Sequence, residues 1–332
     1  MSIHVRAPGR VNLIGDHTDY TGGMVLPMAI DRWTEIRGTA TDTITLQSGD
    51  EPQPAVLDLH VDDPQNAQPQ WAKYVAGVVA EMHPAVGITG TVRTDIPIGA
   101  GLSSSAALEL AVALALGFEG DALSLAQLCR RAEIRASGVP CGIMDQLAIA
   151  AGRADHALLI DCGDLTIEPI PIPDDIEIVV QFVAHRTLAG SAYADRVAEC
   201  ATAESLIGPL RTATLQESAT IDDDAIRDRA HHVISENQRV RDFAAALVAG
   251  DLRGAGALMI SSHESLRDMY CVSTPVMNQA VEHVSALRGV YGARMTGGGF
   301  GGCIVALTEP GALADGWVVR AVDGAHHVDQ SR

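Results

Sequence analysis

Alternating apolar and polar positions dominate the first sixty residues and predict β-structure there. Residues 2–7 and 24–30 are predicted strands, and a short polar turn separates them. Residues 34–61 alternate in places, as in TEIRGTATDTITLQS, which is typical of antiparallel strands with one buried face.

The spacing of apolar residues then changes to that of helices. Residues 70–83 carry apolar side chains three and four positions apart, which predicts a helix. Residues 86–97 are a predicted strand, 98–105 a Gly/Ser loop, and 106–118 a further helix.

The segment at 124–138 is also a predicted helix. Ser124 and Gln127 have the spacing of a capping box, and Gly138 suits the end of the helix.

The second half of the chain mixes strands and helices without regular alternation. Strands are predicted at 156–162, 165–172 and 176–183. Helices are predicted from about Tyr193, from Asp222 to Gly250, and before residue 262, and two strands flank a glycine cluster near the C-terminus. This order favours an α+β fold over a doubly wound α/β fold.

A Pro-rich, acidic segment around residues 170–177 is the best candidate for a domain boundary. With 332 residues, of which 47% are hydrophobic, the chain has enough material for about two domains. We therefore expect an N-terminal domain at 1–172 and a C-terminal domain at 173–332.

Charge and cysteine spacing exclude several classes of function. The net charge of -19 disfavours nucleic acid and anionic membranes as partners. The only lysine is Lys73, and no G-x-x-x-x-G-K-[ST] phosphate loop occurs. The six cysteines form no C-x-x-C pair, and the N-terminus lacks an apolar signal core, so we expect a cytoplasmic protein with reduced thiols.

Three stretches of the sequence carry candidate chemistry. The first is GRVNLIGDHTDY, residues 9–20, which crowds hydrogen-bonding groups behind a short apolar run. A solvated turn is one explanation. The alternative is that these groups converge on a ligand with many hydroxyls.

The second stretch, IPIGAGLSSSAALE, joins a strand to a helix through a Gly/Ser loop. Gly99 and Gly101 allow close approach of the backbone, and the helix N-terminus favours an anion. Ser103, Ser104 and Ser105 could add hydroxyls to a phosphate or to Mg²⁺. An ordinary serine-capped helix explains the three serines equally well, but not the whole run.

The third stretch, GVPCGIMDQ, places Asp145 among apolar neighbours. A carboxylate in such surroundings needs a partner or has a raised pKa. Arg10 is a plausible partner that would keep Asp145 ionised, although Asp145 could also simply cap a helix.

A glycine cluster, GGGFGG at 297–302, matches G-x-G-x-x-G by letter. A strand follows it, whereas a dinucleotide-binding fold requires a helix at that point. We therefore expect a turn whose backbone presses on a neighbouring loop or ligand, and a dehydrogenase is the weaker alternative.

Together these stretches resemble the GHMP superfamily of small-molecule kinases, and within it the galactokinase family. The segments GRVNLIGDHTDYTGGMVLPMAI, PIGAGLSSSAALE, GVPCGIMDQ, SSHESLRDMYCVSTP and ARMTGGGFGGC are similar to the family's motifs and occur in its order, from about Arg6 to Cys303. The resemblance implies a ribosomal-protein-S5-domain-2-like N-terminal domain, a ferredoxin-like C-terminal domain and an active site between them.

The resemblance also implies an ATP-dependent sugar 1-kinase that uses Mg²⁺ and converts galactose to galactose 1-phosphate. Asp145 resembles the catalytic base and Arg10 its charge partner. The crowded turn then becomes the sugar-binding loop. The residues that match sugar contacts are Asp16, His17, Asp19, Gly142 and Tyr193.

For the nucleotide, Ser103–Ser105 and Glu133 match the Mg²⁺–phosphate site, with Ser105 and Glu133 as metal ligands. Trp71 and Tyr74 match aromatic residues beside the adenine, although without the resemblance their spacing favours a core position. Outside these motifs, His231 and His232 are expected on a solvated helix face. Cys141 is expected to pack beside the site without acting as a nucleophile.

Sugar identity stays open at this point, because Asp16 stands where the family pattern usually has Glu. By resemblance this carboxylate addresses the sugar near C6, and Asp shortens its reach by about 1.5 Å. The alternatives are a kinase for N-acetylgalactosamine, a uronic acid or another epimer, and a non-catalytic sugar sensor. We expect a monomer whose partners are a small sugar and ATP.

Overall fold

The alternating N-terminal segments form a large sheet with strand order β13-β1-β3-β6-β4-β5. The computed structural model describes residues 2–185 and 189–328. The strands of this sheet are β1 (Ser2–Asn12), β3 (Pro27–Thr41), β4 (Ile44–Ser48), β5 (Ala55–Leu57), β6 (Gly87–Thr94) and β13 (His326–His327). The antiparallel strands expected over 34–61 are present where β4 pairs with β5, but the other edge of β4 runs parallel to β6. The reason is that β6, from later in the chain, inserts between β3 and β4.

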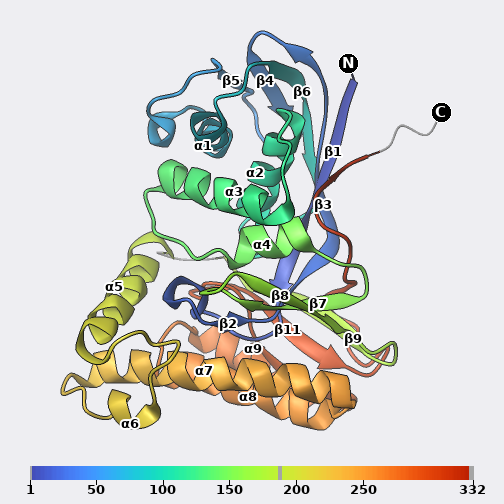
Figure 1. Cartoon of the computed structure of the whole chain (residues 1–332). Helices are drawn as coiled ribbons and strands as arrows, with labels where there is room; N and C mark the ends of the chain where they lie inside the picture. The colour runs from blue at the N-terminus through green and yellow to red at the C-terminus, as the bar shows by residue number, and fades with distance from the viewer. Residues whose placement is uncertain (1, 186–188, 329–332) are drawn as a thin grey trace.

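Four helices lie on one side of this sheet (Figure 1). They are α1 (Ala72–Met82), α2 (Ser104–Ala115), α3 (Ala122–Ser137) and α4 (Met144–Ala151). Helix α2 is alanine-rich and buried on most of its surface, so it packs closely against β1, α1 and α3.

The predicted end of α3 is confirmed, but its predicted beginning is wrong. Gly138 ends the helix in the left-handed conformation, as expected. The capping box at Ser124 is wrong, because α3 begins at Ala122. Asp121 is the N-cap, and its carboxylate accepts a hydrogen bond from the Ser124 amide.

The second half of the chain forms a four-stranded antiparallel sheet with order β10-β11-β9-β12, and long helices pack against it (Figure 1). Its strands are β9 (Glu177–Ala184), β10 (Val290–Met295), β11 (Gly302–Thr308) and β12 (Trp317–Val319). The helices of this half are α5 (Ala189–Ile207), α6 (Leu215–Ser218), α7 (Asp224–Ala249), α8 (Leu252–Asp268) and α9 (Pro275–Ser285).

A small sheet with order β2-β7-β8 lies between these two parts in Figure 1. Its strands are β2 (Met24–Val25), β7 (His156–Asp161) and β8 (Thr166–Pro171), and the 3-10 turns are η1 (Asp19–Thr21) and η2 (Pro64–Asn66). The β1–β2 loop, residues 13–23, thus leaves the large sheet and enters the small one. This path brings its polar residues close to the C-terminal elements.

The division at 1–172 and 173–332 stays a prediction. The chain does pass from β8 to β9 at the expected boundary segment. Residues 326–327, however, return to the large sheet as β13 and pair with β1 at Val5 and Arg6. Within the described ranges, no helix combines the length and the apolar character that crossing a bilayer would need.

Candidate active site

Two adjoining cavities lie where the loops that carry the sequence motifs meet in space. The larger cavity has a volume of about 400 Å³ and the smaller one about 330 Å³. Every candidate residue named from the sequence lines one or both of them. The residues common to both are Arg10, Tyr74, Ser105, Glu133 and Asp145.

Asp145 stands at the junction of the cavities, in the first turn of α4. The ion pair expected with Arg10 is present, with Nε and Nη2 at 2.8 and 2.7 Å from Asp145 Oδ1. The Ser103 hydroxyl donates to the other oxygen, Oδ2, at 2.5 Å. Arg10 is 4% exposed and Asp145 30%, so the carboxylate is held from the protein side while it remains accessible from the cavities.

The Gly/Ser loop before α2 has a backbone suited to contact with a ligand. Gly99 and Gly101 have φ values of +76° and +82°, which residues with a Cβ rarely adopt. Ser103 occupies the N-cap position with φ +61°, but its side chain makes no capping hydrogen bond. The simple serine-cap explanation therefore fails for Ser103, whose hydroxyl binds Asp145.

Ser105 and Glu133 meet at the same junction. The Ser105 hydroxyl donates to Glu133 Oε1 at 3.2 Å, and Gln146 Nε2 donates to Oε2 at 2.5 Å. Burial, together with the charge of Asp145, raises the pKa of Glu133 to about 7. Among the described residues no three His, Cys, Asp or Glu side chains gather as a metal site. A cation here would need further oxygens from a phosphate or water.

Trp71 and Tyr74 line the larger cavity at the start of α1. The Trp71 indole N–H donates to the Gln53 carbonyl at 3.1 Å, and the ring also packs against the main core. A core position and a place beside a ligand, the two interpretations of these aromatics from the sequence, are therefore compatible.

The β1–β2 loop places His17 and Asp19 in the smaller cavity. His17 has a left-handed φ of +66°, a strained conformation for histidine. Burial, with the charges of Asp145 and Asp16, raises the pKa of Asp19 to about 6. Tyr193 of α5 and Cys141 line the same space. Burial raises the pKa of the Cys141 thiol, so this thiol stays protonated at neutral pH.

Gly142 fits against Asp19 only because it lacks a side chain. A Cβ at this position would lie 1.8 Å from Asp19 Oδ2. The sequence motif therefore encodes a contact between two segments more than a hundred residues apart.

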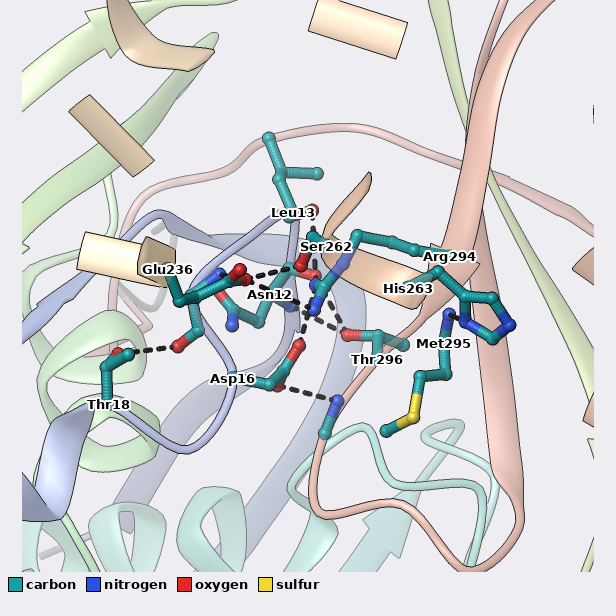
Figure 2. A network of polar contacts seen from close by, with 12 residues as sticks. Asn12, Leu13, Asp16, Thr18, Glu236, Ser262, His263, Arg294, Met295 and Thr296 are labelled. Atoms are coloured by element: carbon teal, nitrogen blue, oxygen red, sulfur yellow. Dashed lines mark hydrogen bonds and ion pairs between the residues drawn. The ribbon is translucent and has the colours of Figure 1, made fainter. Parts of the chain in front are cut away.

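Asp16 lines the smaller cavity, but both its oxygens are engaged by the protein (Figure 2). Oδ2 pairs with Arg294 Nη1 at 2.6 Å, and Oδ1 accepts from the Gly297 amide at 2.9 Å. Arg294 is fully buried and also donates to the Leu13 carbonyl at 3.3 Å. This ion pair joins the β1–β2 loop to β10.

Glu236 of α7 extends this network (Figure 2). It accepts from the Gly15 amide at 3.0 Å and from the Ser262 hydroxyl, and Arg239 Nε lies 2.6 Å from its other oxygen. Burial opposes its ionisation. The charges of Arg239 and Arg294 nevertheless lower the pKa of Glu236 to about 2, so it stays charged.

The expectation that His232 lies on a solvated face is wrong. His232 is fully buried, with Nδ1 2.8 Å from Ser265 Oγ and Nε2 3.2 Å from the Asp16 carbonyl. Burial lowers the pKa of His232 to about 4, so the ring is neutral. It lies on the same face of α7 as Arg229 and Glu236, which are also buried. The neighbouring His231 is half-buried.

The glycine cluster forms the turn between β10 and β11. Gly297 and Gly298 line the smaller cavity, and a Cβ on Gly299 would lie 2.5 Å from the Val272 carbonyl. The turn joins two strands with no helix after it, as the sequence indicated. The dinucleotide interpretation therefore has no structural support in the described chain.

Sequence reasoning missed several buried groups at the cavities. Gln146 lines the smaller cavity, whereas Arg294, Glu236 and Glu109 are buried and line neither. Arg294, Gln146 and Glu109 lie inside quoted motifs, so their position was a usable signal. Glu109 interrupts the apolar face of α2 and is fully buried. Burial, with the charge of Glu133, raises its pKa well above the usual range.

Three family models match the chain in order. Residues 2–37 match the galactokinase galactose-binding signature, residues 72–153 the N-terminal domain of GHMP kinases, and residues 243–316 the GHMP kinase C-terminal domain. The first match contains the β1–β2 loop, and the second contains Ser103, Glu133 and Asp145.

Curated relatives and solved structures agree with these matches. A galactokinase of Roseiflexus sp. is 45% identical over 92% of this chain and 83% of its own length. The galactokinase of Homo sapiens is 41% identical over 93% and 84%. The structure of Lactococcus lactis galactokinase complexed with galactose superposes with a TM-score of 0.92, at 31% identity, over 98% of this chain and 95% of that one.

Removal of the Arg294 side chain tests the buried network. Arg294→Met is expected to lower the free energy of unfolding by about 3–5 kcal/mol, because Asp16 and Glu236 would stay buried without this cation. Chemical denaturation measures the change. Arg288→Met is the matched control, because Arg288 is exposed and should tolerate the same substitution. Equal stability of the two variants would contradict the importance of the network.

Proposed function

Since this chain belongs to the galactokinase family of GHMP kinases, we propose how its residues transfer the γ-phosphoryl group of ATP to galactose. The fold is the two-domain α+β fold of that family, and the protein is a kinase of the galactokinase type. The reaction joins O1 of the sugar to the γ-phosphorus and releases ADP and a proton.

One observation carries the assignment of the reacting centre. Asp145 and Arg10 line both cavities, at the place where the two spaces meet. We assign the larger cavity to ATP, because it contains the glycine-rich turn, the N-terminus of α2 and two aromatic side chains. The smaller, carboxylate-lined cavity takes the sugar, whose hydroxyls need many fixed acceptors.

Asp145 is the proposed base. Arg10 and Ser103 fix its two oxygens, so the carboxylate is oriented before the sugar arrives. It would accept a hydrogen bond from the O1 hydroxyl and take its proton as the new O–P bond forms. The transition state of such transfers is loose, so positioning and charge neutralisation dominate the catalysis. Arg10 and the free amides at the start of α2 supply positive potential.

Ser105 and Glu133 fit a Mg²⁺ site, because they bring a hydroxyl and a carboxylate oxygen together at the junction of the cavities. A protein commonly gives Mg²⁺ only one or two carboxylates, and phosphate and water supply the rest. Bound there, Mg²⁺ would neutralise charge on the transferred phosphoryl group. Trp71 and Tyr74 are the proposed neighbours of the adenine.

On the sugar side, we propose contacts from His17, Asp19, Tyr193 and the backbone at Gly142. Asp16 is the exception, because Arg294 and Gly297 already occupy its oxygens. It can accept a sugar hydroxyl only through its remaining lone pairs. We therefore propose that Asp16 acts mainly through the shape of the loop.

Phosphorus NMR with ATP, Mg²⁺ and a sugar panel tests this function. Galactose is expected to give a new signal of an anomeric phosphate, whereas 6-deoxygalactose and N-acetylgalactosamine test the two ends of the sugar site. Transfer only to another sugar would make Asp16→Glu the next variant to examine. Binding of ATP with no transfer to any sugar would favour the sensor alternative. Monomeric state and cytoplasmic location remain predictions from the sequence.

Loss of the base should reduce turnover without loss of nucleotide binding. Asp145→Ala is expected to lower kcat by about 10²- to 10⁴-fold, the usual range for general-base catalysis. A steady-state assay gives kcat, and calorimetry gives the affinity for ATP. Asp175→Asn, an exposed carboxylate before β9, is the control. Near-normal kcat in Asp145→Ala would remove Asp145 from the mechanism.

A methyl group at residue 142 should selectively impair the sugar site. Gly142→Ala is expected to raise the KM for galactose, because its Cβ would overlap Asp19 Oδ2 and push the carboxylate away. The KM for ATP should change little, since Gly142 lines only the smaller cavity. Gly49→Ala is a suitable control because its Cβ would meet no neighbouring atom. An unchanged KM for galactose would refute the contact.

Sugar binding should weaken in acid as Asp19 takes up a proton. Its pKa is about 6, and only the ionised carboxylate can accept two hydroxyls, so the Kd for galactose should rise about tenfold per pH unit below pH 6. Calorimetry without ATP measures this and should detect proton release near pH 6. In Asp19→Asn the rise of the Kd for galactose below pH 6 should be absent. A Kd that stays constant from pH 7 to pH 5 would contradict the role of Asp19.

A further inference from the structure

A chain of hydrogen bonds leads from the β1–β2 loop into the C-terminal half. His17 Nδ1 lies 3.1 Å from the Tyr20 hydroxyl, and the Tyr20 and Tyr270 hydroxyls are 2.5 Å apart. The Tyr270 hydroxyl in turn lies 3.0 Å from Cys200 Sγ of α5. Four side chains from three separate segments are thus joined in one line that ends on the imidazole of His17.

Packing holds this line in place. Tyr270 is fully buried, and Cys200 and His17 are 1% and 4% exposed. The rings of His17 and Tyr270 lie 4.8 Å apart, and the buried ring of His232 covers Tyr270 from another side at 4.5 Å. Tyr193 lies 5.6 Å from His17. The ring of His17 therefore has little freedom to turn.

The hydrogen bonds along this line can all point in one of two directions. In one, Cys200 donates to Tyr270, Tyr270 to Tyr20, and Tyr20 to His17 Nδ1. In the other, His17 donates from Nδ1, and the line ends with the Tyr270 hydroxyl donating to Cys200 Sγ. A phenol O–H is a good donor and a neutral imidazole nitrogen a strong acceptor, so the first direction gives the stronger hydrogen bond at the His17 end. The thiol is weak both as donor and as acceptor, so the Cys200 end has little influence on the direction. Burial raises the pKa of Cys200 to about 11, so its S–H proton is present.

The first direction fixes the tautomer of His17. A nitrogen that accepts a hydrogen bond carries no proton, so in the neutral ring the proton must lie on Nε2. We propose that Tyr20 and Tyr270 are positioning residues that hold His17 in the Nε2–H form, so that its ring serves as a hydrogen-bond donor to the sugar.

The smaller cavity contains many acceptors, so a hydrogen-bond donor at His17 would be useful there. Asp16, Asp19 and Asp145 all line it and supply acceptors. Each sugar hydroxyl has one proton to donate but two lone pairs to satisfy, so a cavity rich in carboxylates needs donors as well. The other lining side chains that can donate are Arg10, Tyr74, Ser105, Ser137, Cys141, Gln146 and Tyr193, and an Nε2–H on His17 would add an imidazole donor to this set. The inference rests on the proposed sugar-kinase function, because it assigns His17 a role toward the sugar.

Nitrogen NMR of the free protein tests the tautomer without any assay of activity. Protein labelled with ¹⁵N-histidine, with His17→Gln to identify the signals, should show Nε2 as protonated and Nδ1 as unprotonated at neutral pH. Tyr20→Phe should convert His17 to a tautomeric mixture or to the Nδ1–H form. A wild-type Nδ1–H tautomer, or a doubly protonated ring, would overturn the inference even if the kinase function is correct.

Kinetics of the phenylalanine variants tests whether Tyr270 acts on His17 through Tyr20. Tyr20→Phe is expected to lower kcat/KM for galactose by about 2- to 12-fold, the net value of one hydrogen bond, with the KM for ATP unchanged. Tyr270→Phe should have a smaller effect, and none in the Tyr20→Phe background, because Tyr270 acts through Tyr20. Tyr291→Phe is the matched control on β10, outside both cavities.

The outcomes separate the two levels of the proposal. If the effects of the Tyr20 and Tyr270 substitutions on kcat/KM were fully additive, Tyr270 would not act through Tyr20 and the inference would be overturned, although galactose would still be phosphorylated. Absence of transfer by the wild type to any sugar would refute the proposed function, while the NMR result for His17 would stand as a property of the fold.

Discussion

The buried ion pair between Arg294 and Asp16 holds the two parts of this molecule in register. Both side chains are almost completely buried, so each depends on the other and on hydrogen bonds from neighbouring segments. Such pairs contribute less net stability than their Coulomb attraction indicates, because the cost of desolvation offsets it. Such a pair instead fixes the geometry of the segments that carry it, since few alternative arrangements satisfy both charges.

This constraint explains how the smaller cavity, the proposed sugar site, is built. The β1–β2 loop has little regular structure of its own, yet its backbone is held at Leu13, Gly15 and Asp16 by Arg294, Glu236 and His232. His17 and Asp19 follow immediately, and the strained backbone at His17 is maintained by this support. The proposed sugar contacts are thus positioned by Arg294, Glu236 and His232, which do not line the cavity.

Local and repeated patterns made much of the fold predictable from the sequence. Helix α2, its glycine-rich entry loop and the pairing of Arg10 with Asp145 followed from periodicity, turn chemistry and the need of a buried carboxylate for a partner. Strand order did not, because the insertion of β6 between β3 and β4 depends on contacts distant in sequence. His232 was misplaced for a related reason. A polar residue on a long charged helix gives no sign of the partner that will bury it.

The tail that ends in β13 has a mechanical consequence. After β12 the chain returns across Asp31, Ala29, Gly152 and Ile149 by backbone hydrogen bonds before it joins β1. The large sheet and the β9–β12 sheet are therefore linked by the chain at two places, between β8 and β9 and again beyond β12. Any hinge motion of one sheet against the other must keep both crossings of the chain intact, which limits the directions in which such a motion can occur.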